Sequence, residues 1–100
     1  MLEYFKTLLC DELHGAEEYI KLALEFKATY PEWAKTFVSM SATELEHATN
    51  IYKMAEMSYK ETADAYSEPP EFLHEMWEYI VDKYTKKTAK VKYMHEAFNK

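Results

Sequence analysis

The chain has 100 residues, enough for one small domain with a single core, and it carries a formal charge of −6 without any run of Lys or Arg. This acidic balance argues against nucleic-acid binding, and no apolar stretch approaches the roughly 20 residues that a membrane span requires. The single cysteine, Cys10, and an N-terminus without the order of a signal peptide fit a reducing cytoplasm. We therefore expect one cytoplasmic domain over residues 1–100.

The distribution of glycine and proline predicts an all-α fold. Gly occurs once and Pro three times, and good helix formers fill the chain between them. Pro31 suits the first turn of a helix, and the second break at residues 67–70 offers Ser67 as an N-cap before two prolines in an opening turn. These breaks predict helices over about 2–29, about 31–65 and about 69–98.

Each predicted helix carries an apolar stripe with the spacing of three and four residues that is typical of bundle helices. The first stripe consists of Leu2, Phe5, Leu9, Leu13, Ala16, Ile20 and Ala23. The second consists of Trp33, Phe37, Ser41, Ala48, Ile51, Ala55 and Tyr59. The third consists of Leu73, Trp77, Ile80, Tyr84, Val91, Met94 and Phe98.

Two carboxylates fall within these stripes. Glu12 lies three residues after Leu9 in the first helix, and Glu44 lies midway between Phe37 and Ile51 in the second. Carboxylates are almost never fully buried unless they are paired or bind a metal. Six other acidic residues of these two helices lie on their polar sides: Glu3, Asp11, Glu18, Glu25, Glu32 and Glu46.

His47 supplies a third ligand for the same site. Glu44 and His47 are one turn apart on one helix face, and an inward Glu-x-x-His with a Glu from the adjacent helix is the ligand set of di-iron carboxylate bundles. Counted from the break at Tyr30, the levels of Glu12 and Glu44 differ by about 6 Å at about 1.5 Å per residue. Oxygen and nitrogen ligands of this kind suit iron or manganese, and zinc is an alternative.

At this point residues 2–60 resemble the rubrerythrin branch of the ferritin-like superfamily. The segment 11–23, DELHGAEEYIKLA, is similar to the first ligand helix of that family, in which a ligand Glu precedes a Tyr by seven residues, as Glu12 precedes Tyr19. Glu44-Leu45-Glu46-His47-Ala48 is similar to the family's Glu-x-Glu-His-Ala. The resemblance implies metal ligation by Glu12, Glu44 and His47, with Tyr19 beside the site to orient a ligand; a purely packing role for Tyr19 is the alternative.

The chain departs from the family in its third helix. The family's subunit has four helices and a second set of ligands, whereas this chain offers only Glu71 and His74, which lie off the stripe near the prolines and are not expected to bind metal. We expect His95, which lies nearer the stripe, to be a packed or half-exposed core residue. The simplest completion is a homodimer or larger homo-oligomer in which two hairpins form one four-helix bundle around two metal ions.

The function that the resemblance implies is that of a non-haem di-iron protein which oxidises ferrous iron or reduces peroxide or dioxygen. Without a Cys-x-x-Cys motif, the electron donor of a peroxidase would be external. One alternative is a structural or interaction bundle with a vestigial or non-redox metal site. Another is a metal-free polar cluster in which the ligands are hydrogen-bonded to Tyr19 or Tyr52.

Overall fold

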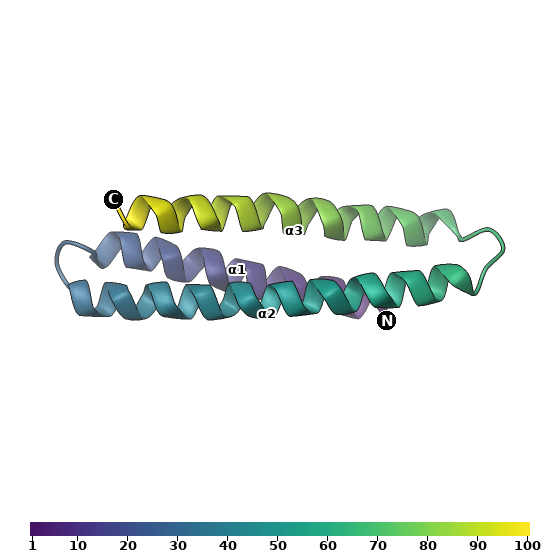
Figure 1. Ribbon diagram of the computed structural model, residues 1–100, viewed down its shortest axis with the longest axis horizontal. Helices are drawn as coiled ribbons and strands as arrows, with labels where there is room; N and C mark the ends of the chain where they lie inside the picture. The colour runs from purple at the N-terminus through teal and green to yellow at the C-terminus, as the bar shows by residue number, and fades with distance from the viewer.

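The computed structural model describes all of residues 1–100 and confirms an all-helical chain of three helices without strands. The helices are α1 (Leu2–Phe26), α2 (Pro31–Asp64) and α3 (Glu71–Phe98), and successive helices run antiparallel, side by side along a rod of 58 × 16 × 15 Å (Figure 1). At about 1.5 Å per residue, the 34 residues of α2 span most of the rod. None of the three helices combines the length and apolarity that crossing a membrane would demand.

The helix ends lie within three residues of the predicted ones. Helix α1 ends at Phe26, three residues before the predicted end, and Pro31 opens α2 as expected. Helix α3 begins at Glu71 rather than 69, because Pro70 has an extended ψ of 141° and serves as the N-cap. The Pro70 carbonyl accepts hydrogen bonds from the amides of Leu73 and His74, so the expected cap by Ser67 is wrong.

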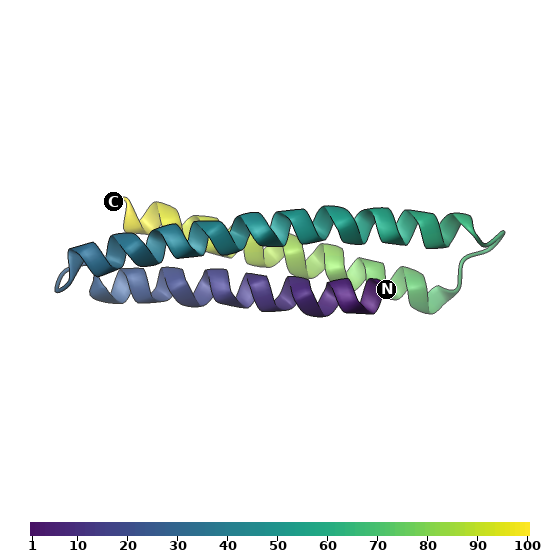
Figure 2. The same ribbon diagram turned by 90° about the horizontal axis from the view of Figure 1, so that it is seen from below.

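The core lies along α1, which packs against both other helices, while α2 and α3 contact each other less. Figure 2 shows α3 behind the α1–α2 hairpin. Two clusters of buried residues form this core, and burying each large aliphatic side chain contributes about 1.5–3 kcal/mol. The larger contains Leu2, Leu9, Leu13, Ala48, Ile51, Ala55, Leu73 and Ile80, and the smaller contains Ala16, Ile20, Ala23 and Val91.

The predicted stripes supply this core with one clear exception. Trp33 was expected in the core, but 55% of it is exposed, and Ala34 is buried in its place. The Trp33 ring stacks on Tyr30 at the α1–α2 turn, with the ring centroids 4.2 Å apart. The Trp33 indole therefore lies on the surface of the chain and not in its core.

Candidate metal centre

The structure brings the three predicted ligands together from two helices. Glu12 lies in the middle of α1, and Glu44 and His47 lie one turn apart on the antiparallel α2. One ligand atom of each lies within 4.8 Å of the others, and no other His, Cys, Asp or Glu residues of the chain form such a group. The offset between helices that the sequence suggested thus does not keep the three ligand atoms apart.

The cluster lies on the face of the α1–α2 hairpin that is opposite α3. On α1, Glu12 is about 140° around the helix from Glu17, which contacts lysines of α3. On α2, Glu44 and His47 are about 140° and 160° from Thr49, which contacts Tyr84 of α3. We call this outer face the α1–α2 seam.

The Glu12 carboxylate contains the one buried oxygen of the cluster that lacks a hydrogen-bond partner. Glu12 Oε2 is buried and has no hydrogen-bond partner, although 27% of the side chain remains exposed. His47 Nδ1 lies 3.6 Å away, which is too long for a hydrogen bond, and His47 is half-exposed. An unpartnered buried carboxylate oxygen is what a bound cation would satisfy.

Glu44 shows the same need for positive charge. Its pKa is raised above the ordinary value, first because its protonated form can hydrogen-bond to Glu12, then by burial, then by repulsion from the Glu12 charge. The opposing charge of His47 lowers the pKa by a smaller amount. Two carboxylates this close hold a proton more tightly than usual, and a divalent cation would compete for the same place.

Gly15 allows the Glu44 carboxylate to lie against α1. A Cβ atom at position 15 would lie 3.2 Å from Glu44 Oε2, closer than an ordinary van der Waals contact. Gly15 is the only glycine of the chain and lies inside a helix, where Gly is less favourable than Ala by roughly 1 kcal/mol. The close approach of the Glu44 carboxylate explains why a glycine occupies this helical position.

Tyr19 lies near the cluster but makes no hydrogen bond to a candidate ligand. It is half-buried, stacks on Phe37 with a centroid distance of 6.2 Å, and lines a small pocket together with Glu44 and Met40. Tyr52 instead stacks on Tyr84 of α3. Neither tyrosine hydroxyl is hydrogen-bonded to the carboxylates, and the predicted orienting role of Tyr19 stays a prediction.

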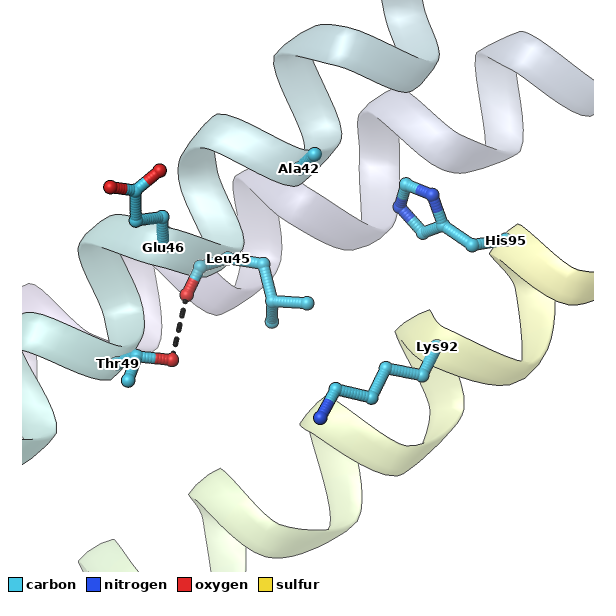
Figure 3. Close-up of a pocket in the computed structure, with 6 residues that line it drawn as sticks. All are labelled: Ala42, Leu45, Glu46, Thr49, Lys92 and His95. Carbon is cyan, nitrogen blue, oxygen red and sulfur yellow. Dashed lines mark hydrogen bonds between the residues drawn. The ribbon is translucent and has the colours of Figure 1, made fainter.

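The remaining histidines do not belong to the cluster. His74 is exposed and pairs through Nε2 with Glu78 at 2.9 Å, whereas Glu71 is exposed at the start of α3. His95 lines a groove between α2 and α3 together with Lys92 and Leu45 (Figure 3). Its Nε2 lies 2.9 Å from the buried Ser41 hydroxyl, and burial lowers the His95 pKa.

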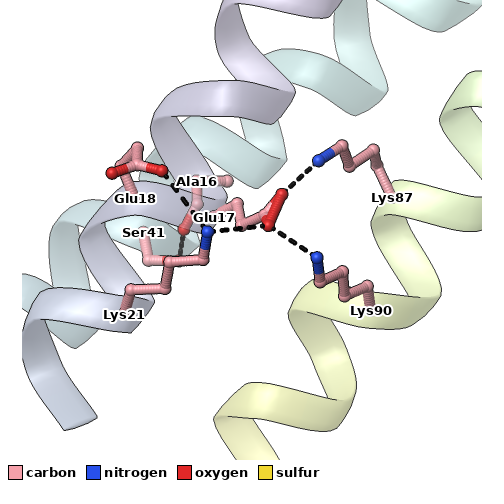
Figure 4. A network of polar contacts seen from close by, with 7 residues as sticks. All are labelled: Ala16, Glu17, Glu18, Lys21, Ser41, Lys87 and Lys90. Carbon is pink, nitrogen blue, oxygen red and sulfur yellow. Dashed lines mark hydrogen bonds and ion pairs between the residues drawn. The ribbon is translucent and has the colours of Figure 1, made fainter.

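Sequence reasoning missed a third carboxylate inside a stripe, Glu17. It is only 3% exposed, and its oxygens contact the ammonium groups of Lys87 and Lys90 from α3 and of Lys21 from α1 (Figure 4). These contacts lower the Glu17 pKa to about 2, the Lys87 hydrogen bond most, against the opposing effect of burial. The signal was available, because Glu17 lies four residues after Leu13 and three before Ile20.

No protein-family model, curated protein or solved structure matches the chain. The fold and the cluster define it as a three-helix bundle with a carboxylate–histidine group on the α1–α2 seam.

Proposed function

We propose that this chain is a subunit of a ferritin-like, rubrerythrin-like non-haem iron protein, which oxidises ferrous iron or reduces peroxide or dioxygen. Two iron ions would be shared by two subunits, each contributing Glu12, Glu44 and His47. The observation that carries the proposal is the convergence of these ligand atoms within 4.8 Å, with a buried Glu12 oxygen that has no partner. Bound iron would supply the one-electron chemistry with the oxidant.

The negative charge of a shared site would be neutralised by two divalent ions. Two copies of Glu12 and Glu44 bring four negative charges to one place, and two Fe²⁺ ions would neutralise them. Neutral His47 would add a nitrogen ligand to each ion, a combination that suits iron. Manganese or zinc would satisfy the same charges without the same reaction with oxygen.

The α1–α2 seam has the sequence pattern of a helix–helix interface. On α2, an apolar or ligand residue recurs every seven positions, and all four members of this row are exposed: Trp33, Met40, His47 and Met54. On α1 the corresponding rows are half-buried: Phe5, Glu12, Tyr19 and Phe26, with Leu8, Gly15 and Leu22 beside them. Heptad rows of this kind are typical of helices that pack against further helices in a bundle.

We therefore expect a homodimer in solution. Two seams facing each other would cover the exposed apolar residues and place both ligand sets within one four-helix core. Sedimentation at micromolar concentration should give a dimer with about one iron per chain. A monomer that retained two iron ions per chain would contradict the shared site.

The reaction is tested by iron content and oxidation. Protein purified without chelator and supplied with Fe²⁺ without oxygen should bind iron, and addition of air or peroxide should oxidise that iron faster than in buffer. The zinc-loaded protein is the control, because zinc occupies the ligands without redox chemistry. Iron that is bound but oxidised no faster than in buffer would contradict the redox function.

The second candidate is a structural bundle without a redox metal, and one observation favours it. The raised pKa of Glu44 shows that the cluster can reduce its own repulsion with a proton instead of a metal ion. An external electron donor would then have no role. Failure to bind iron, manganese or zinc at neutral pH would support this candidate over the first.

The Gly15→Ala variant should change helix stability and iron binding in opposite directions. Alanine should stabilise the metal-free helix by up to about 1 kcal/mol. The new Cβ would also press on Glu44 Oε2 and displace the carboxylate by a few tenths of an ångström. We expect a higher melting temperature without iron together with weaker iron binding; equal or tighter iron binding would contradict the assigned contact.

A further inference from the structure

A continuous row of oxidisable aromatic rings lies between α2 and α3. In order, the rings are Tyr59, Trp77, Tyr52 and Tyr84, which come alternately from α2 and α3. Successive centroids are 5.2, 5.6 and 4.1 Å apart, with interplanar angles of 9°, 23° and 11°. All four are half-buried, and no phenylalanine, which resists one-electron oxidation, interrupts them.

The Tyr59 end of the row has a base. The Tyr59 hydroxyl lies 3.4 Å from His74 Nδ1, and His74 Nε2 lies 2.9 Å from a Glu78 oxygen. In the neutral tautomer that donates from Nε2 to the carboxylate, Nδ1 is free to accept the phenol proton. A positive charge formed on His74 would be stabilised by Glu78.

The Tyr84 end of the row has no base. Thr49 donates its hydroxyl hydrogen to the Leu45 carbonyl at 3.1 Å, so Tyr84 donates to the Thr49 oxygen at 2.9 Å. A threonine hydroxyl does not take up a proton at neutral pH. Tyr52 has a raised pKa, chiefly because of burial, and no hydrogen-bond acceptor for its hydroxyl. Loss of a phenol proton is therefore easiest at Tyr59.

We propose that this row is a one-electron relay that moves an oxidising equivalent away from the candidate iron centre to Tyr59. The oxidant is a hydroxyl radical, the one-electron product of Fe²⁺ and peroxide, so this step rests on the proposed function. The radical takes one electron from the row and one proton from solvent and becomes water. Tyr59 supplies the electron through Trp77 and Tyr52, loses its proton to His74, and becomes a neutral tyrosyl radical.

The row begins across α2 from the candidate ligands. His47 and Tyr52 are five residues apart on α2, about 7.5 Å along its axis and about 140° around it, so the electron passes from one face of the helix to the other. The row leads from that level toward the α2–α3 turn, where His74 and Glu78 are exposed. An oxidising equivalent held at Tyr59 can be reduced there by a donor in solution.

The first experiment tests the end of the relay without iron. Metal-free protein is oxidised by a photogenerated ruthenium(III) polypyridyl complex, freeze-quenched, and examined by electron paramagnetic resonance. We expect a tyrosyl signal that Tyr59→Phe removes and His74→Gln shortens severalfold in lifetime, while Tyr93→Phe, at an exposed α3 position outside the row, changes nothing. A signal that persists unchanged in Tyr59→Phe overturns the proposal.

The second experiment tests the path. Iron-loaded protein is treated with peroxide, and the yield of the Tyr59 radical is compared in the parent, Trp77→Phe and Tyr52→Phe. We expect each variant to lower the yield at least fivefold, with helix content checked by circular dichroism. An unchanged yield in both folded variants overturns the relay. Absence of bound iron, with the photochemical signal still at Tyr59, would instead overturn the proposed function.

Discussion

The Glu44→Gln variant is expected to fold like the parent and to lose its iron. The substitution keeps the shape of the side chain but removes the negative charge beside Glu12 that a divalent ion would neutralise. Loss of a residue that only supports a metal ligand typically weakens metal binding by roughly 10–100-fold, and loss of the ligand itself should do at least as much. Iron content after dialysis and titration with Fe²⁺ under nitrogen give the measurement.

Without metal, the Glu44→Gln substitution should not destabilise the fold. Because Glu12 raises the pKa of Glu44 in the folded chain, the stabilising contribution of protonated Glu44 is present at low pH and is lost as the pH rises through that raised value. At neutral pH the Glu44 charge thus opposes folding. We expect metal-free Glu44→Gln to be at least as stable as the parent in urea.

A matched control is available two residues away. Glu46 is exposed on the same helix and lies outside the ligand group, so Glu46→Gln should change neither iron content nor stability. Iron should also raise the melting temperature of the parent and of this control but not of Glu44→Gln, since a ligand of the folded state stabilises it. Parent-like iron binding by Glu44→Gln would show that the ligand assignment is wrong.

The three helices were predictable because each boundary depends on local chemistry. Pro31 and the pair Pro69–Pro70 interrupt an otherwise helical sequence, and the stripe spacing predicts which faces pack. The buried row of α2 repeats every seven residues and consists of Ala34, Ser41, Ala48 and Ala55. Trp33 precedes this row by one residue, so its ring lies outside the core and stacks on Tyr30. Periodicity predicts the direction of a side chain and not whether another helix covers it.

The partners of the buried carboxylates could not be predicted from the spacing within one helix. Glu12, Glu17 and Glu44 all interrupt apolar stripes, yet Glu17 has three lysines around it while the other two have each other and His47. The lysines that meet Glu17 lie partly on α3, 70 and 73 positions away, and the spacing within one helix cannot reveal them. A buried carboxylate thus predicts a nearby cation without saying which kind.

The Glu17→Ala variant is expected to lose on the order of 3 kcal/mol of stability. Breaking a buried ion pair by removing one partner typically costs about 3–5 kcal/mol, and here the remaining lysines can turn partly toward solvent. Because two of the three lysines belong to α3, the loss should loosen the packing of α3 on α1. Urea unfolding gives the measurement, and Glu18→Ala, whose exposed carboxylate lies 3.6 Å from Lys21 alone, should change stability by less than about 0.5 kcal/mol.

The pH dependence identifies the charge of Glu17 as the cause. A folded-state pKa lowered from 4.5 to about 2 contributes about 3 kcal/mol above pH 4.5, and this contribution is lost as the pH falls toward 2. Protonated Glu17 then resembles glutamine in charge and shape. The difference in unfolding free energy between the parent and Glu17→Gln should therefore be large at pH 7, shrink below pH 4.5 and approach zero near pH 2. A difference that stayed constant over this range would mean that Glu17 stabilises the bundle by packing, and the lysine contacts would then contribute little.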